Sequence, residues 1–199
     1  MKISNFFSIV AIVLAAITVS SCNNRKFQVD GTITDAKDST LYFENMSLNG
    51  PVVVDSVKLD ADGTFLFKSD AGEAPEFYRL RIADQIINVC VDSTETITVK
   101  AAYPSMAYQY EISGSEDCSK IKELALLQMR LQGQINAIAQ NPDLGVDAMN
   151  DSIDRIMQAY KTNVKMNYIY KEPMKAYAYF ALFQTVRLGN TVSLIFNPR

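Results

Sequence analysis

Three cysteines, Cys22, Cys90 and Cys118, are the side chains of this sequence with the clearest capacity for covalent chemistry. A thiolate can act as a nucleophile, and two neighbouring thiols can form a disulfide. Cys90 and Cys118 do not form a Cys-x-x-Cys pair, and the chain contains no histidine. Without histidine, Ser-His-Asp and Cys-His catalysis and most zinc sites are excluded. We therefore expect no catalytic residue, no metal site and no cofactor in this chain.

Cys22 follows a segment that is typical of an export signal. Lys2 provides a basic start, residues 6–19 form an apolar run, and small residues precede the cysteine. This run is too short to span a bilayer comfortably and fits a secretory signal peptide. The residues Val19-Ser20-Ser21-Cys22 also resemble a bacterial lipobox, which implies that residues 1–21 are removed and that Cys22 is acylated. The alternative is a plain secretory signal with a free cysteine nearby.

Acylation of Cys22 predicts a periplasmic protein that is anchored by lipid to the inner or outer membrane of a bacterium. Each buried methylene contributes about 0.8 kcal/mol, so several acyl chains anchor a protein stably. The polar residues 22–26 then form a short tether. The formal net charge of −3 and the lack of a basic run give no footprint for nucleic acid. The expected partner is therefore the membrane, through the lipid on Cys22, and not nucleic acid.

Cys90 and Cys118 leave two hypotheses open. In an oxidising compartment they could form a disulfide; otherwise they are free or buried thiols, which is the default expectation. Cys90 alternates with Val89 and Val91, so it is expected on the more polar side of a strand, together with Asn88.

The chain between the tether and Gly114 has the pattern of a β-sandwich-like domain over residues 27–114. Short runs of β-branched and aromatic residues recur at the spacing of an antiparallel sandwich. Asp62-Gly63 is a hairpin signal, because glycine adopts a positive φ without strain. The expected strands are 27–34, 40–46, 52–59, 64–68, 77–82, 86–91, 96–100 and 108–112.

After Gly114 the apolar period changes to about 3.6 residues, which predicts helices. Ser115 can cap the first one, whose acidic first turn suits the positive end of the helix dipole. Residues 141–145 break this helix, and a second begins near Val146. The two apolar stripes predict a helical hairpin; they consist of Leu124, Leu127, Leu131, Ile135 and Ile138, and of Val146, Met149, Ile153, Ile156 and Tyr160.

A third helix is expected to start at Pro173, because proline is favoured in a first turn. Its apolar residues occur on all sides, so it needs burial on several sides. Only one further apolar stretch precedes Arg199. We therefore expect the helical connector 115–199 to continue into another domain. The fold class is α+β, with strands and helices segregated along the chain.

Several segments occur in an order that resembles a domain of unknown function. They are 27–33, 41–43, 54–57, 62–65, 77–80 and 112–115. That domain looks like the N-terminal, lipid-anchored part of periplasmic thiol-disulfide oxidoreductases, which carry a C-terminal thioredoxin-like or alkyl-hydroperoxide-reductase-like domain. The resemblance implies a role in cell redox homeostasis. The family's activity resides in a Trp-Cys-x-x-Cys segment that this sequence lacks, so neither Cys90 nor Cys118 receives a catalytic role.

Two functional hypotheses follow. In the first, the chain is a non-catalytic, membrane-anchored module that positions or docks a thioredoxin-like domain or a protein partner. In the second, it is a stand-alone periplasmic binding or structural lipoprotein without a redox role.

Two further patterns each have a simpler alternative. Asp60-Ala61-Asp62-Gly63 resembles the start of a calcium loop, but phenylalanines occupy the next ligand positions, so a turn is favoured. Aromatic residues in the helical half could line a ligand cleft, although core or domain interface is the commoner role. These residues are Tyr160, Tyr168, Tyr170, Tyr177, Tyr179, Phe180 and Phe183.

Overall fold

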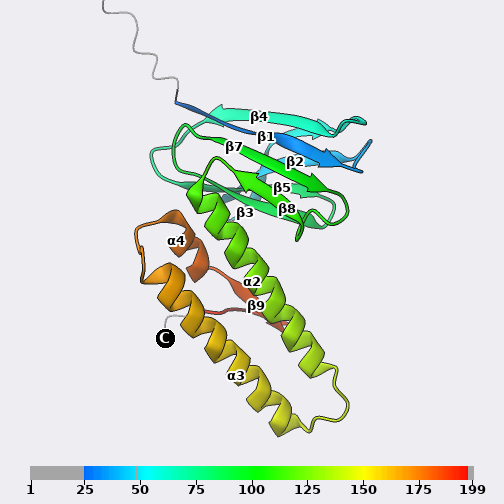
Figure 1. The fold of residues 1–199 in the computed structure, drawn as a ribbon, viewed down its shortest axis with the longest axis vertical. Coiled ribbons are helices and arrows are strands. Elements are labelled where there is room, and N and C mark those ends of the chain that lie inside the picture. Colours follow the sequence, from blue (N-terminus) through cyan, green and yellow to red (C-terminus); the bar gives the residue numbers. More distant parts are fainter. Residues whose placement is uncertain (1–24, 48, 197–199) are drawn as a thin grey trace, which may run out of the picture.

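The computed structural model describes residues 25–47 and 49–196, which form an α+β fold in which strands precede helices (Figure 1). The predicted signal peptide covers residues 1–21, which lie outside the described residues. The predicted anchor at Cys22 and most of the predicted tether 22–26 also lie outside them. The first strand begins at Lys26, within the range predicted for the tether.

Two four-stranded sheets form a β-sandwich, with strand orders β4-β1-β7-β8 and β3-β2-β5-β6. Neighbouring strands are antiparallel except β1 and β7, which are parallel. The antiparallel prediction is therefore wrong for this one pair, whereas all eight predicted strands are present. Their bounds are β1 Lys26–Thr34, β2 Thr40–Ser47, β3 Gly50–Lys58, β4 Thr64–Asp70, β5 Glu76–Ile82, β6 Gln85–Val91, β7 Thr96–Ala102 and β8 Tyr110–Ser113.

The sandwich core is built by alternate side chains of both sheets, as the period of two along a strand requires. The Phe43 ring stacks on Phe67 of the other sheet at 5.2 Å and on Tyr78 at 4.8 Å between ring centroids. Gly31 lets β1 approach β7, because a Cβ atom there would lie 1.7 Å from the carbonyl oxygen of Val99. Aromatic stacking and close strand approach thus fix the interior of the sandwich.

The Asp62-Gly63 turn is not a hairpin, which corrects the sequence prediction. It joins β3 to β4, and these strands belong to different sheets. The Asp60 carboxylate oxygen Oδ1 accepts hydrogen bonds from the backbone N–H groups of Asp62 and Gly63, both at 3.0 Å. The carboxylate of Asp60 therefore stabilises a crossover turn between the sheets.

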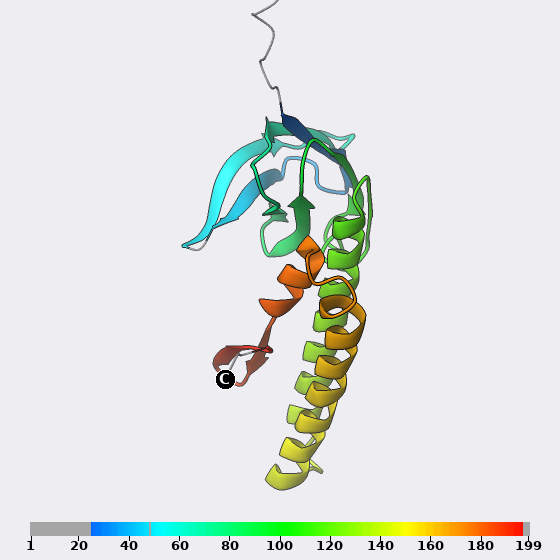
Figure 2. The same cartoon turned by 90° about the vertical axis from the view of Figure 1, so that its left-hand side faces the viewer.

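The predicted helical hairpin is confirmed: α2 (Glu116–Ala139) and α3 (Val146–Val164) run side by side and extend away from the sandwich (Figure 2). Ser115 caps α2 by accepting a hydrogen bond from the Cys118 N–H. Val146 was expected between the helices, but it is 69% exposed at the far end of the hairpin. A π-helical segment, η1 (Lys165–Ile169), continues α3. Among the helices described, none is long and apolar enough to cross a membrane.

The third helix, α4 (Ala176–Leu182), starts at Ala176 and not at Pro173, so the predicted start is wrong and the helix is shorter than predicted. Lys175, its N-cap residue, has an extended backbone. The side chain of Asp117, at the start of α2, accepts a hydrogen bond at 3.0 Å from the backbone N–H of Tyr177. This N–H is one of the unpaired donors of a helix N-terminus, so a distant carboxylate fixes where α4 begins.

A small hairpin of β9 (Thr185–Leu188) and β10 (Thr191–Leu194) follows α4 and was not predicted. Glutamines of α2 hold β9 in place. Gln132 donates to the Arg187 carbonyl at 3.0 Å and accepts from the Arg187 N–H at 2.8 Å, and Gln128 donates to the Thr185 carbonyl at 2.8 Å. The hairpin therefore uses side chains of a distant helix to satisfy its main chain.

Candidate functional site

The structure brings Cys90 and Cys118 together at the joint between the sandwich and α2. Both are free thiols with 0% exposed surface. The Cys118 Sγ atom lies 3.2 Å from the backbone nitrogen and 3.1 Å from the backbone oxygen of Cys90. The side of β6 that carries Cys90 was expected to be polar, but helix α2 packs on it.

Neither thiol has the environment of a nucleophile. Burial raises the pKa of Cys118 to about 11 and also raises the pKa of Cys90. The reactive form of cysteine is the thiolate, and catalytic cysteines have lowered pKa values. The pair is therefore unsuited to thiol-disulfide catalysis.

The outer face of the sheet β3-β2-β5-β6, which points away from the other sheet, is only partly covered by helices. Along β5, Tyr78, Leu80 and Ile82 point into the core, so Phe77, Arg79 and Arg81 occupy the outer face. Residues from two neighbouring strands thus meet on a surface that the helices leave partly open.

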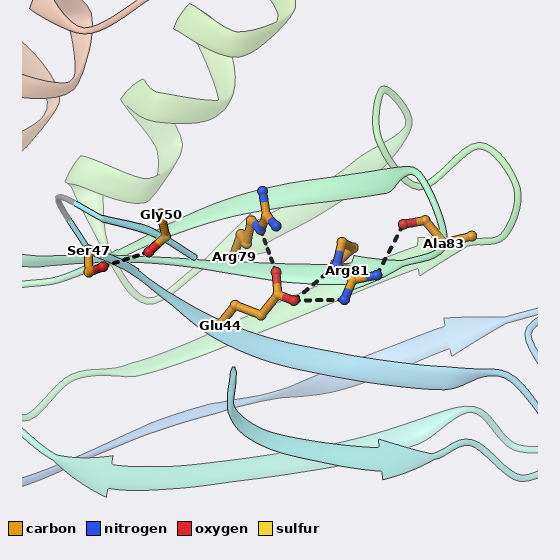
Figure 3. A network of polar contacts seen from close by, with 6 residues as sticks. All are labelled: Glu44, Ser47, Gly50, Arg79, Arg81 and Ala83. Carbon is orange, nitrogen blue, oxygen red and sulfur yellow. Dashed lines mark hydrogen bonds and ion pairs between the residues drawn. The ribbon is translucent and has the colours of Figure 1, made fainter. Parts of the chain in front are cut away.

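A charged cluster of Glu44, Arg79 and Arg81 lies on this outer face (Figure 3). Glu44 is 3% exposed, and its two carboxylate oxygens accept hydrogen bonds from Arg79 Nε at 2.5 Å and from Arg81 Nε at 3.0 Å and Nη2 at 2.7 Å. The hydrogen bond from Arg81 lowers the pKa of the Glu44 carboxyl from its ordinary value of 4.5; burial opposes this, and Arg79 reinforces it.

The cluster carries a surplus positive charge, since two guanidiniums share one carboxylate. The guanidinium of Arg81 also lies 4.5 Å from the centre of the Tyr42 ring and donates to the Ala83 carbonyl at 3.3 Å. Both arginines remain partly exposed. This arrangement can present fixed hydrogen-bond donors to a partner's carboxylate.

An aromatic cluster of Phe77, Tyr179, Phe180 and Phe183 adjoins the charged cluster. The Phe77 ring centroid lies 6.2 Å from that of Tyr179 and 6.1 Å from that of Phe180, and Tyr179 lies 4.9 Å from Phe183. Phe77 and Arg79 are next neighbours on one side of β5, so the two clusters are contiguous. Tyr179 and Phe183 are each 55% exposed.

Seven aromatic residues were predicted as either cleft or core, and five of them divide into two groups. Of the other two, Phe180 is partly buried against Phe77, and Tyr170 belongs to neither group. Tyr160, Tyr168 and Tyr177 are buried, and their hydroxyl groups bond to Gln184, Glu123 and Glu172, respectively. Tyr179 and Phe183 lie on the surface beside the sheet, whereas Tyr170 is exposed elsewhere. The first group stabilises the helical half, and the second forms the accessible part of the aromatic cluster.

Sequence reasoning missed Glu44, Phe77, Arg79 and Arg81 as site residues. Charged residues alternate with apolar ones along β5, which indicates a solvated strand face. This pattern does not identify Glu44 as the partner of the two arginines. The sequence predicted β3 as a strand over residues 52–59 but did not identify it as an exposed sheet edge, where Val52, Val53 and Val54 are all exposed. Three consecutive valines without alternation were the available signal.

Two surface grooves beside α2 offer little for catalysis. One groove of about 380 Å³ between α2 and α3 is lined by apolar and amide side chains with Arg130. Another, of about 390 Å³, lies between α2 and the β9–β10 hairpin and contains Arg187. Neither lining pairs an acid with a base.

Comparison with known proteins is informative for the sandwich half of the chain. No curated protein sequence matches the chain. Among solved structures, a 9R-lipoxygenase from Cyanothece PCC8801 aligns with this chain at 8% sequence identity and a TM-score of 0.26. The alignment covers 84% of this chain and 32% of the lipoxygenase chain. A similarity this low supports no inference about fold or function. Residues 27–121, the sandwich and the start of α2, match the family model described as Domain of unknown function (DUF4369), which confirms the predicted resemblance to such a domain.

Proposed function

We propose that the chain is a non-catalytic, lipid-anchored periplasmic module of a thiol-disulfide oxidoreductase and that it docks a thioredoxin-like redox domain. One observation carries the proposal: the exposed aromatic cluster adjoins the charged cluster on the outer face of the sheet. Aromatic residues and arginine are the types enriched at the centres of protein interfaces.

The aromatic cluster supports docking because it leaves large apolar side chains in water. Helix α4 buries Tyr177, Ala178 and Ala181 on one side and exposes Tyr179 on the other. A partner that covers Tyr179 and Phe183 would gain hydrophobic stabilisation of about 25 cal/mol per Å². The surplus positive charge of the charged cluster favours a partner with acidic side chains at its rim.

The choice of a thioredoxin-like partner rests on the resemblance of residues 27–115 to the N-terminal part of such oxidoreductases. The buried thiols agree with a module that leaves the redox chemistry to its partner.

The proposed anchor would hold the module close to the membrane. Strand β1 begins at Lys26, four residues after Cys22. Four extended residues reach at most about 14 Å. A docked redox domain would consequently work near the bilayer surface.

A binding experiment tests the docking proposal. The chain carrying Cys22→Ser would be titrated with the thioredoxin-like domain of an oxidoreductase whose N-terminal part resembles residues 27–115. We expect Tyr179→Ala or Phe183→Ala to weaken binding about tenfold, and Val146→Ala, at the far end of the helical hairpin, to leave it unchanged. Absence of binding, or equal binding by all variants, would favour the stand-alone lipoprotein.

Two further measurements test the anchor and the lack of catalysis. Cells fed a clickable fatty acid should label the chain, and Cys22→Ala should abolish the label; undiminished labelling would refute acylation at Cys22.

The purified chain should not reduce insulin disulfides, because its thiols are buried and their pKa values are raised.

A further inference from the structure

Cys90 and Cys118 are separated by 28 positions in the sequence and meet in the fold. The Cys118 Sγ lies 3.2 Å from the Cys90 nitrogen. Because an N–Cα bond is about 1.46 Å long, this sulfur lies within about 4.7 Å of the Cys90 Cα atom. The Cys118 sulfur therefore lies directly beside the backbone of Cys90, as the short range of a disulfide requires, in which the two Cα atoms are about 4.4–6.8 Å apart.

The two side chains also point toward the same joint. Val89 and Val91 fill the sandwich core, so Cys90 projects from the outer face of β6 onto α2. Cys118 lies in the first turn of α2 and is fully buried. The contact therefore links one strand of the sandwich to the start of the helical half.

We propose that Cys90 and Cys118 form a disulfide when the chain folds in an oxidising compartment, and that this bond ties β6 to the first turn of α2. The inference goes beyond the docking function and does not depend on it. Its occurrence in the cell rests on the proposed export of the chain.

The redox chemistry requires a disulfide-containing oxidant, for which glutathione disulfide serves as the probe. One cysteine thiolate attacks glutathione disulfide and releases one glutathione thiolate, which leaves a mixed disulfide. The second cysteine thiolate then attacks the protein sulfur of that mixed disulfide and releases the other glutathione. The two cysteines lose two protons and two electrons, and one glutathione disulfide becomes two glutathione molecules.

The bond would form during folding rather than afterwards. In the folded chain neither thiol is accessible, and burial disfavours the thiolate form of both. In the unfolded chain both thiols meet the oxidant freely. Once formed, the bond would also secure α4, because Asp117, next to Cys118, caps that helix.

Refolding followed by peptide mapping tests the proposal. The full chain with Cys22→Ser is unfolded, reduced and refolded either in a glutathione disulfide buffer or in reductant, and remaining thiols are blocked with iodoacetamide. Trypsin places Cys90 in peptide 82–100 and Cys118 in peptide 101–120. We expect these peptides to be linked after oxidative refolding and alkylated after reductive refolding. Alkylation of both after oxidative refolding to a native circular dichroism spectrum would overturn the proposal.

Thermal unfolding provides the second readout. The oxidised chain should melt about 5–15 °C above the reduced chain, as expected for closing a loop of this length in a domain of this size. Cys90→Ala and Cys118→Ala, which each remove one partner, should melt at the same temperature in both buffers. Equal melting temperatures of the oxidised and reduced Cys22→Ser chain would contradict a bond that ties the two elements together.

Discussion

Glu44 shows how a single carboxylate organises the outer face of the sheet. Its oxygens accept hydrogen bonds from two arginines of the neighbouring strand, so that none of the three charges is left without a partner. Removing one member of such a cluster leaves buried charge unpaired, which costs more than the pair contributed.

We expect Glu44→Gln to lower the free energy of unfolding by about 2–3 kcal/mol, less than for a fully buried pair because both arginines are partly exposed. Denaturant unfolding monitored by circular dichroism measures this change. The matched control is Asp38→Asn, which breaks the exposed pair with Lys58 at 3.1 Å and should change stability by less than about 0.5 kcal/mol. Equal effects of the two substitutions would show that the charged cluster is not a stabilising unit.

The same carboxylate predicts a pH dependence. The folded pKa of Glu44 lies below its ordinary value of 4.5, so its contribution is complete above that pH and is lost as the pH falls through the folded pKa. The difference in unfolding free energy between the unaltered chain and Glu44→Gln should therefore be constant between pH 5 and 7, and should shrink below about pH 4.5. A difference that stays constant down to pH 3 would contradict the lowered pKa.

At the scale of elements, the start of α4 depends on one residue of α2. The Asp117 carboxylate accepts the Tyr177 N–H, and it is nearly buried. We expect Asp117→Ala to destabilise the chain by about 1–2 kcal/mol and to accelerate amide hydrogen exchange across residues 176–182.

Glu116 is the matched control for Asp117. It is adjacent in sequence, but its side chain is exposed and pairs with Lys175 at 3.5 Å. Glu116→Ala should leave exchange in α4 almost unchanged. Equal acceleration in both variants would mean that general charge near the helix, and not the cap, fixes α4.

The sequence correctly predicted those elements whose signals lie within the element itself. The eight strands and the hairpin of α2 and α3 follow from alternation, from the helical period and from the Ser115 cap. The start of α4 and the β9–β10 hairpin depend instead on contacts from α2, namely Asp117 with Tyr177 and Gln132 with Arg187. Such contacts join residues more than fifty positions apart, so no local pattern reveals them.

The candidate site was predictable only in part, for the same reason. Tyr179 and Phe183 stood out as aromatic residues of a helix that is apolar on all sides. Their neighbour Phe77 comes from a strand about a hundred positions earlier, and Glu44 meets Arg79 across 35 positions. Only the folded sheet places these residues on one surface.

At the scale of the whole molecule, one face of the sandwich depends on the helical half for its cover. The family match ends at residue 121, near the start of α2. The rings that cover Phe77 belong to α4, far beyond that boundary. The helical half therefore both covers part of the outer face and supplies the exposed aromatic residues beside it.

This dependence predicts the behaviour of a shortened chain. A chain that ends after Ile121 should fold its sandwich strands but expose Phe77, and should therefore bind an apolar dye such as anilinonaphthalene sulfonate several times more strongly than the full chain does. Phe77→Ser in the shortened chain should remove most of the additional fluorescence, whereas Leu66→Ser, at a position already exposed on β4, should not. If dye binding does not increase on shortening, the packing of α4 against Phe77 is not what protects this face, and the outer face must be closed by the sandwich itself.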